Sequence, residues 1–129
     1  MPGIGDRRGT SGPWPDWYGY AEVVRVGPLA VTAGCTAAVD GVVQAVADAA
    51  GQARISLRAG LAALAEVGLR PEHVIHTRVY VVDRADAVAV GTVHGEVFGD
   101  VRPAATMVVV AGLVDPAMLV EVELTAWVG

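Results

Sequence analysis

Alternating hydrophobic and polar positions predict β-strands in several parts of this chain. The runs Ala21–Val26 and Leu29–Ala33 are rich in β-branched residues, and the Gly27-Pro28 pair between them is typical of a tight turn. These features together predict a β-hairpin, and Asp40-Gly41 marks another turn after it. Farther along the chain, His73–Val82 alternates in the same way and predicts a further strand.

Between about Asp48 and Val67 the hydrophobic period changes to that of a helix. Apolar side chains recur there at intervals of three or four residues and form one stripe, made of Ala50, Ala53, Leu57, Leu61 and Leu64. Gly68 is suited to end this helix, because glycine readily adopts the left-handed conformation of a C-terminal cap. Asp83 is suited to cap a second helix, which extends to about Phe98.

The last quarter of the chain predicts two more strands, joined by a turn at Val114-Asp115-Pro116. The first of them opens after Arg102-Pro103. In the second, Glu121 and Glu123 are two positions apart, so both side chains share one face. The other face of this strand is apolar and carries Val120, Val122 and Leu124. Two carboxylates on one face of a strongly β-forming run mark this strand as a candidate site.

The predicted order is β-β-α-β-α-β-β, with two helices that cover one face of a sheet. This order indicates an α+β two-layer domain of the ferredoxin-like or chorismate-mutase-like kind. We expect one such domain over residues 18–129. Residues 1–17 mix glycine and proline with polar residues and predict an extended, partly mobile lead-in.

The composition is apolar for a chain of 129 residues, with 53% hydrophobic residues and a mean hydropathy of +0.49. No apolar run approaches the roughly 20 residues that span a bilayer, so no membrane association is expected. The N-terminus lacks the apolar segment of a signal peptide, which predicts a cytoplasmic protein. The apolar excess also favours self-association, which would bury part of that surface.

The charged residues, the single cysteine and the histidines exclude several classes of function. The net charge is −5 and the nine basic residues, all arginine, are scattered, which argues against nucleic-acid binding. The single cysteine excludes an intrachain disulfide and a cysteine-based zinc cluster, and the three histidines do not have metal-ligand spacing. No lysine is present, so no lysine side chain can form a Schiff base.

Six segments, in their order and spacing, resemble the RidA/YjgF family over about residues 18–128. They are Gly19-Tyr20, Val31–Gly34, Gln52–Gly68, Val79–Asp83, Arg102–Ala104 and Val120–Glu123. The resemblance implies a homotrimer whose sheets form a central β-barrel, with small-molecule clefts at the three subunit interfaces. It also implies hydrolysis of reactive imines and enamines to a keto acid and ammonia, with no cofactor and no metal.

One position departs from the pattern of the family's deaminases. Those members carry Pro-Ala-Arg before Ser or Thr, and the arginine grips the substrate carboxylate, whereas this chain has Ala105 before Thr106. Alanine cannot replace a bidentate guanidinium contact, so the loss is expected to cost several kcal/mol of binding. Arg102 precedes Ala105 by three positions, which places it on the opposite face of a regular strand unless Pro103 distorts that strand. The chain therefore resembles an arginine-lacking branch, in which imine deamination is not assumed.

The resemblance also assigns roles along the predicted cleft. Glu121 matches an acidic residue that positions a water or handles a proton, and a closed cleft is expected to raise its pKa. Glu123 is interpreted as a structural residue of the barrel. Cys35 follows Gly34 beside the cleft, where its thiol is a nucleophile, a substrate contact or an inert buried group.

Four further residues complete the predicted substrate site. Tyr20 matches an aromatic residue that closes the cleft from the neighbouring subunit. Met107 makes the pocket floor apolar, and Thr106 offers a hydroxyl or serves as a plain β-former. His94, on the second helix, is expected at the edge of the cleft.

We therefore expect a cofactor-free enzyme that acts on an imine, an enamine or a related reactive intermediate through Glu121 and water, as a tailoring or cyclising step in a biosynthetic pathway. The alternative is a non-catalytic trimer that binds a metabolite or shields a partner enzyme at the same clefts. A third function, the ribonuclease activity attributed to some relatives, is disfavoured by the acidic charge.

Overall fold

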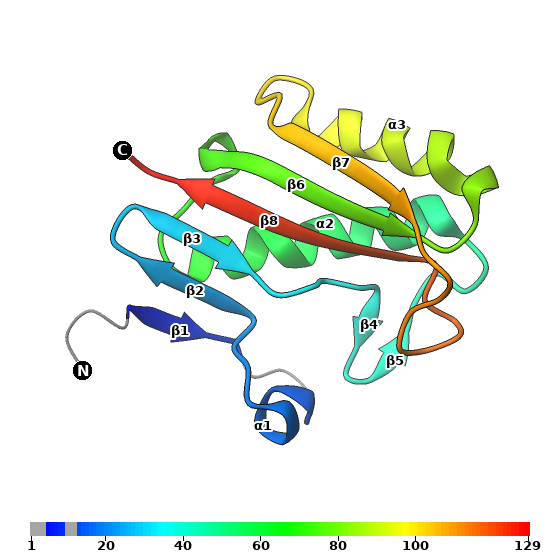
Figure 1. Cartoon of the computed structure of the whole chain (residues 1–129), viewed down its shortest axis with the longest axis horizontal. Coiled ribbons are helices and arrows are strands. Elements are labelled where there is room, and N and C mark those ends of the chain that lie inside the picture. Colours follow the sequence, from blue (N-terminus) through cyan, green and yellow to red (C-terminus); the bar gives the residue numbers. More distant parts are fainter. Residues whose placement is uncertain (1–4, 10–12) are drawn as a thin grey trace.

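The computed structural model describes residues 5–9 and 13–129. The chain folds into a six-stranded sheet with two long helices on one face (Figure 1). The sheet has the order β1-β2-β3-β8-β6-β7, and its neighbours are antiparallel except for the parallel pair β6 and β7. Its strands are β1 (Asp6–Arg8), β2 (Val23–Val26), β3 (Leu29–Thr32), β6 (Val74–Val81), β7 (Ala104–Val109) and β8 (Val120–Trp127). A separate small hairpin consists of β4 (Ala38–Val39) and β5 (Val42–Val43).

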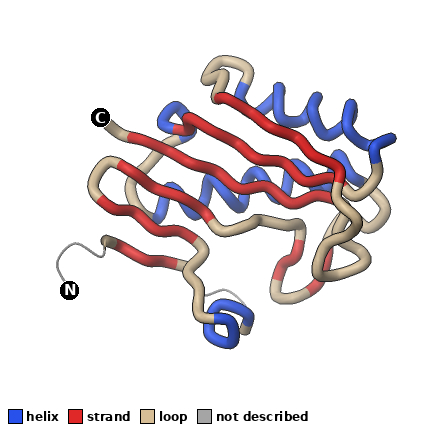
Figure 2. Tube along the Cα trace, in the orientation of Figure 1, coloured by secondary structure: helices blue, strands red, loops and turns tan. Residues whose placement is uncertain are grey.

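The long helices α2 (Ala49–Glu66) and α3 (Ala87–Phe98) lie side by side on one face of the sheet (Figure 2). A short helix α1 (Trp14–Tyr18) and two 3-10 turns, η1 (Pro71–His73) and η2 (Arg84–Asp86), complete the described elements. None of the described helices covers the opposite face of the sheet, which we call the open face. The predicted α+β two-layer fold is confirmed.

Strand β8 shows how the alternating pattern builds the core. Its residues Val120, Val122, Leu124 and Ala126 are buried against the helices, where they meet Leu57 and Leu64 of α2 and Phe98 of α3. Each of the larger side chains contributes about 1.5–3 kcal/mol when it leaves water. The intervening positions, which include Glu121 and Glu123, lie on the open face.

The predicted turns are present, but Asp83 does not cap the second long helix. Its side chain accepts the N–H of Ala85 at 2.9 Å and caps η2 instead, and α3 begins after Asp86. In the β2–β3 hairpin, Val26 pairs with Leu29 across Gly27, whose φ is +56°. Asp40 and Gly41 both have positive φ, as a two-residue type I′ hairpin requires.

The C-terminus of α2 also follows the prediction. Gly68 has φ +86° and donates its N–H to the carbonyl of Ala65 at 3.1 Å. The N–H of Leu69 reaches back to the carbonyl of Leu64 at 3.0 Å. These two bonds form a Schellman cap, which satisfies carbonyl groups that the helix end leaves without partners.

The closing strands differ from the simplest reading of the sequence. β7 and β8 do not pair with each other, because β6 lies between them. β7 pairs with β6 in parallel, and a parallel pair needs a crossover connection, which α3 provides. The turn at Val114-Asp115-Pro116 therefore joins strands that are separated in the sheet.

The N-terminal segment, expected as an extended, partly mobile lead-in, contains two short elements that were not predicted. Asp6–Arg8 pairs with Val23–Arg25 and adds an edge strand to the sheet, and Trp14–Tyr18 forms α1. Residues 1–4 and 10–12 of that segment lie outside the described part of the chain. Within the described part, no helix has the length and apolarity that a membrane span requires.

Candidate functional site

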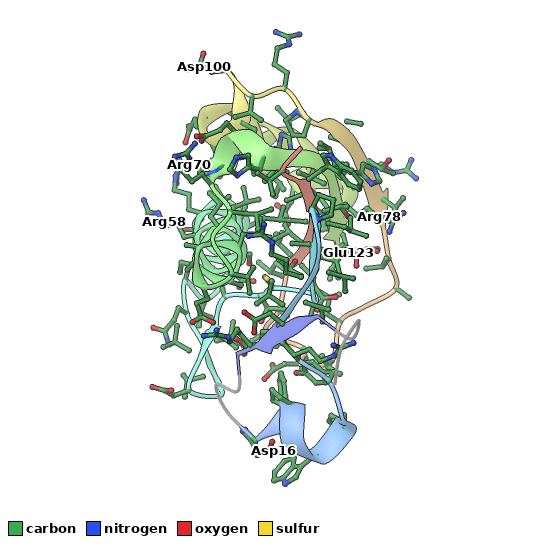
Figure 3. The ribbon with its side chains drawn as sticks, turned by 90° about the vertical axis from the view of Figure 1, so that its left-hand side faces the viewer. Asp16, Arg58, Arg70, Arg78, Asp100 and Glu123 are labelled. Carbon is green, nitrogen blue, oxygen red and sulfur yellow. The ribbon has the colours of Figure 1, made fainter. Side chains whose placement is uncertain are left out.

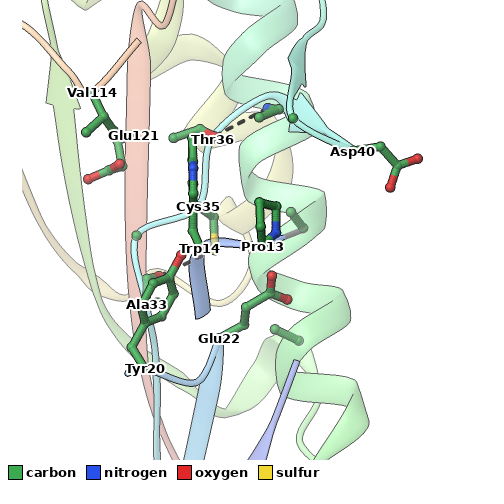
Figure 4. A pocket seen from close by; sticks show the side chains of 15 residues that line it. Pro13, Trp14, Tyr20, Glu22, Ala33, Cys35, Thr36, Asp40, Val114 and Glu121 are labelled. Carbon is green, nitrogen blue, oxygen red and sulfur yellow. Dashed lines mark hydrogen bonds between the residues drawn. The ribbon is translucent and has the colours of Figure 1, made fainter. Parts of the chain in front are cut away.

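A cavity of about 460 Å³ lies where the loop after β3 passes between β8 and α2 (Figure 4). This volume falls in the range of small-molecule pockets, about 300–1,000 Å³. The loop, α1 and its flanks, α2 and β8 all contribute to its wall. The lining residues are Pro13, Trp14, Tyr20, Glu22, Ala33, Gly34, Cys35, Thr36, Ala38, Asp40, Gly41, Ala59, Ala63, Val114 and Glu121.

Gly34 allows the loop to approach β8 closely. A Cβ atom at this position would lie 2.7 Å from the carboxylate carbon of Glu121, well inside van der Waals contact. The next residue, Cys35, exchanges two backbone hydrogen bonds with Val122, at 2.6 and 2.9 Å. The loop is thereby fixed against the strand, and the Glu121 carboxylate lies beside the loop backbone.

Glu121 is half-buried in this wall, and burial raises the pKa of its carboxyl, with a smaller contribution from the neighbouring charge of Glu123. Its carboxylate has no hydrogen-bond or ion-pair partner among the described residues. A carboxyl group of raised pKa, beside a cavity, is better suited to proton transfer than a fully solvated carboxylate.

Glu123 lies on the same face of β8 but in a different environment. Its Oε1 accepts a hydrogen bond from the hydroxyl of Tyr80 at 2.5 Å and lies 3.6 Å from Nη1 of Arg78. The same hydrogen bond raises the pKa of the Tyr80 hydroxyl. In Figure 3, Arg78 and Glu123 extend from one side of the sheet, whereas Arg58 and Arg70 lie on the helix side. Glu123 is thus held in an open-face network outside the cavity lining.

Cys35 lines the cavity with a protonated thiol. Burial raises its pKa to about 11, and its Sγ donates to the carbonyl of Ala33 at 3.4 Å. A thiol of this pKa is almost fully protonated at neutral pH, and the thiolate is the nucleophilic form. The geometry therefore fits a wall contact better than a nucleophile.

Tyr20 lines the same cavity as Gly34, Cys35 and Glu121 (Figure 4). Burial raises the pKa of its hydroxyl, and the charges of Glu22 and Glu121 add to this shift. The resemblance implied that this residue closes a neighbouring subunit's cleft, and here it borders the cavity of its own chain.

Three polar lining residues were missed by the sequence reasoning, namely Glu22, Thr36 and Asp40. Asp40 belongs to a predicted turn. Because an aspartate is common in turns, the sequence offered no reason to expect it beside a cavity. Glu22 follows Tyr20 by two positions, which is the one signal that could have linked it to the site. α1, which places Trp14 in the wall, was not predicted either.

The residues predicted on β7 lie elsewhere. Ala105 pairs with Thr77 on the helix side of the sheet, and Thr106 pairs with Arg78 on the open side. Met107 shares the helix side with Ala105 and packs against the core. None of the three lines the cavity beside Glu121.

Arg102 and His94 line a second hollow, of about 320 Å³, together with Phe98 and Pro103. Nε2 of His94 lies 2.8 Å from Oγ1 of the buried Thr77, and burial lowers the pKa of the ring. Arg102 precedes β7 and has φ +55°. Arg102 is therefore not part of a regular strand, and strand alternation does not determine on which face its side chain lies relative to Ala105.

One chain thus contains two separate groups of predicted site residues. Tyr20, Gly34, Cys35 and Glu121 line the cavity, and the β7 and α3 residues lie beyond β6 at the sheet edge. In residues 5–9 and 13–129, no three side chains of metal-ligating type form a group that could hold a metal ion.

The fold and the cavity define a class of small α+β proteins with a cavity beside an open sheet face. The sequence model of the family described as Endoribonuclease L-PSP matches residues 16–128. The chain therefore belongs to this family, also known as the YjgF/RidA family.

Individual relatives agree with this assignment. An uncharacterised protein of Streptomyces coelicolor is 39% identical over 124 residues, which cover 95% of this chain and 92% of the relative. The crystal structure of Rv2704, a YjgF/YER057c/UK114 family member from Mycobacterium tuberculosis, is 37% identical with a TM-score of 0.86, and covers 95% of this chain and 98% of its own. Escherichia coli TdcF, solved with bound serine, is 25% identical with a TM-score of 0.80 and 98% coverage of both chains.

Proposed function

We propose that this protein is a cofactor-free enzyme that hydrolyses the C=N bond of an imine, or of the enamine in equilibrium with it, in the cavity beside Glu121. The observation that carries this proposal is the half-buried Glu121 carboxylate, which has a raised pKa, no described partner and direct access to a cavity of about 460 Å³. The bound serine of the related TdcF supports small-molecule binding in the family.

In the proposed reaction Glu121 transfers protons between water and substrate. Its carboxylate takes a proton from a water molecule while the water oxygen bonds to the imine carbon. The protonated carboxyl then gives this proton to the nitrogen, which produces a carbinolamine. When the C–N bond breaks, the carbinolamine hydroxyl gives its proton to the carboxylate and becomes the carbonyl. The carboxyl passes this proton to the departing nitrogen, and a carbonyl compound and ammonia leave. An enamine first accepts a proton at carbon, which gives the iminium ion, the protonated form of the imine. A raised pKa suits both halves of the cycle, because one group must act as base and then as acid.

We also propose that the complete site forms between copies of the chain in a homotrimer. The open face carries exposed apolar side chains on four of its strands, which a second copy would cover: Val26, Leu29, Val31, Val108 and Trp127. The β7 residues Ala105 and Met107, with Arg102 and His94 near them, would then border the cavity of a neighbouring copy. Such a site unites the two groups that one chain keeps apart.

The alternative is a trimer that binds a metabolite, or shields a partner enzyme, without chemistry. The observation that favours it is Ala105, which stands where deaminases of the family carry the arginine that grips the substrate. Ribonuclease activity, which the family description names, is not proposed, because no described residue that lines the cavity is basic.

The proposal is tested with Glu121→Gln, which keeps the size of the side chain and removes the ionisable group. Imines are generated in place by amine or amino-acid oxidases, and ammonia release is followed. Turnover is expected to fall by about 10²–10⁴, the range of a lost general acid or base.

Glu123→Gln is the matched control, because it makes the same chemical change on the same strand face outside the cavity lining, and its turnover should stay within a few-fold of the parent. Unchanged turnover in Glu121→Gln would contradict the mechanism. A parent protein without turnover that still binds ligand would favour the metabolite-binding alternative.

A further inference from the structure

The cavity extends from Glu121 to a second end between α1 and α2. In Figure 4, Glu121 and Val114 stand beside β8, Pro13 stands beside α2, and Cys35 lies between them. The volume of about 460 Å³ equals the share that about 15 water molecules occupy in the liquid. An imine with a methyl side chain would therefore fill only the part of the cavity at Glu121.

The second end of the cavity, which we call the α1 end, has an apolar wall. It is lined by Pro13 and Trp14 from the start of α1 and by Ala59 and Ala63 of α2. The two alanines are four positions apart and share one face of the helix, and their short side chains leave room in front of that face. An alkyl or aromatic group would leave water here for an apolar surface.

The local sequence of α1 places Trp14 in this wall. Pro15 is buried, and its carbonyl accepts the N–H of Gly19 at 2.9 Å, which ends the helix with φ +71° at Gly19. A Cβ at Gly19 would meet nothing within 4 Å, so glycine serves the left-handed conformation there and not a close approach. This turn brings the next residue, Tyr20, back to the cavity that Trp14 lines. Two aromatic rings six positions apart thus border one space.

Two carboxylates besides Glu121 also line the cavity. That of Glu22 lies against the backbone at Gly9, where a Cβ would be 2.7 Å from its Oε2. Asp40 is exposed in the turn of the small hairpin, and Figure 4 shows its carboxylate directed away from Cys35. Recognition at the α1 end therefore depends on apolar contact and not on these charges.

The proposed trimer leaves the α1 end accessible. A neighbouring copy would cover the open face, and would bring Arg102 and His94 to the side of Glu121. The helix α2 packs against the other face of the sheet, so Ala59 and Ala63 stay outside that contact. The polar part of a substrate would then meet Glu121 and the neighbouring copy, and the rest of it would extend toward Trp14.

We infer that the substrate is an imine with a large aromatic side chain, which binds between Trp14 and α2 while the C=N bond lies at Glu121. Trp14 is then a specificity-determining residue, because it contacts a part of the substrate that does not react. Such contacts raise kcat/KM when their binding energy is used at the reacting centre. This inference rests on the proposed function for the reaction, whereas the apolar contact at Trp14 concerns binding alone.

Two imino acids of equal charge and different side chain test the inference. An amino-acid oxidase produces them from phenylalanine and from alanine, and ammonia release above the background rate is followed. We expect kcat/KM for the phenylalanine-derived imine to be greater by about tenfold or more, because a single methylene in an apolar pocket already changes it by about tenfold. Trp14→Ala should lower this ratio by about fivefold or more.

Trp17→Ala is the matched control for Trp14→Ala. Trp17 lies on the same helix, is 70% exposed and does not line the cavity, so its removal should leave the ratio within about twofold. Equal effects of the two variants would overturn the inference that Trp14 selects the side chain.

A second pair of variants fills the space and does not depend on the folding of α1. Ala59→Leu should lower the ratio by about fivefold or more, because the larger side chain would occupy the α1 end. Ala62→Leu makes the same change at an exposed position of α2 that does not line the cavity, and the ratio should stay within about twofold. An unchanged ratio in Ala59→Leu would overturn the inference.

The outcomes separate the inference from the proposed function. Equal or faster hydrolysis of the alanine-derived imine would overturn the inference and leave the enzyme proposal standing. If neither imine is hydrolysed above background, the enzyme proposal fails and calorimetry with phenylpyruvate and pyruvate decides the inference. Phenylpyruvate should bind more tightly by about tenfold or more, and Trp14→Ala should remove most of the difference. Equal affinities, or no binding of phenylpyruvate, would overturn it.

Discussion

Burial and three carboxylates act on the thiol of Cys35 in the same direction. Desolvation is the largest cause, followed by the opposing hydrogen bond of Thr32 and the charges of Glu22, Glu121 and Glu123, and the resulting pKa is about 11. At pH 8 about one molecule in a thousand then carries the thiolate, compared with about one in four for an ordinary cysteine. The thiol is consequently a polarisable, neutral part of the cavity wall.

This leads to a prediction for the reaction of Cys35 with iodoacetamide. In the native protein at about pH 8, alkylation should be slower than in the urea-unfolded chain by about 100-fold or more. Because the thiolate fraction grows until the pH passes the folded pKa, the native rate should still rise steeply between about pH 9 and 10. Mass spectrometry of timed samples measures both rates. A native rate that levels off below about pH 9 would mean that the thiolate is stabilised and that a nucleophilic role must be reconsidered.

The sequence predicted which face of β8 carries Glu121 and Glu123, since strand alternation fixes that, but it could not separate their environments. Their difference depends on which strands lie beside β8. Tyr80 and Arg78 of β6 reach Glu123, and the loop at Gly34 places Glu121 beside the cavity. These neighbours are set by sheet register over more than 40 positions of sequence, which local patterns do not encode.

At the scale of single elements, α2 contains a polar group that connects it to the start of β8. The Gln52 side chain is fully buried and donates through Nε2 to the carbonyl of Ala117 at 2.9 Å. Its Oε1 accepts the N–H of Leu119 at 2.8 Å. These bonds satisfy backbone groups of the loop that leads into the strand of Glu121.

We predict that Gln52→Leu lowers the free energy of unfolding by roughly 2–4 kcal/mol, because three backbone groups lose their partner: the carbonyls of Ala45 and Ala117 and the N–H of Leu119. Urea unfolding at fixed protein concentration measures the change. Gln44→Leu is the matched control: Gln44 is exposed and its side chain bonds only the carbonyl of its near neighbour Val42 among the described residues, so this change should stay within about 0.5 kcal/mol. A similar small effect in both variants would show that water replaces the lost bonds of Gln52.

The elements themselves were predictable to different degrees. The helical spacing of apolar residues and the capping residues predicted α2 and α3 to within a few residues. An apolar stripe and a capping glycine such as Gly68 can be read from the local sequence. The same pattern placed Gln52 and Ser56 off the apolar stripe, yet both are fully buried. Periodicity classifies polar residues as exposed, and it cannot detect a polar side chain whose partners lie in a distant loop.

The strand partners required tertiary information. The parallel pairing of β7 with β6 depends on the crossover through α3. The sequence shows only that β7 and β8 flank a turn, and not that β6 lies between them. Strand β1 has three residues, which are too few to show an alternating pattern. Its backbone pairs with β2, and this pairing cannot be read from the local sequence.

At the scale of the whole molecule, the two faces of the sheet are unequal. One face is covered by α2 and α3, and the open face presents apolar side chains such as Val31 and Trp127 beside the Tyr80–Glu123 network. An apolar face of this kind is suited to contact with other copies of the chain. The two groups of site residues also occupy opposite parts of the sheet, so one chain by itself cannot place Ala105 near Glu121.

We therefore predict that the protein sediments as a trimer at micromolar concentration, with a mass of about 40 kDa, three times the 13.2 kDa of one chain. Val31→Glu, on the open face, should raise the trimer dissociation constant by about 100-fold or more, since an unpaired charge would be buried at the interface.

Val88→Glu is the matched control, because Val88 is 82% exposed on α3, away from the open face, and the change should leave the mass unaltered. Circular dichroism checks that both variants keep the fold. If turnover is lost together with the trimer in Val31→Glu, the site requires residues of a neighbouring copy. A parent protein that remains a monomer, or a Val31→Glu variant that remains a fully active trimer, would show that the open face is not the interface. If the parent protein is a monomer, the residues of β7 cannot reach the cavity of Glu121, because no neighbouring copy brings them there.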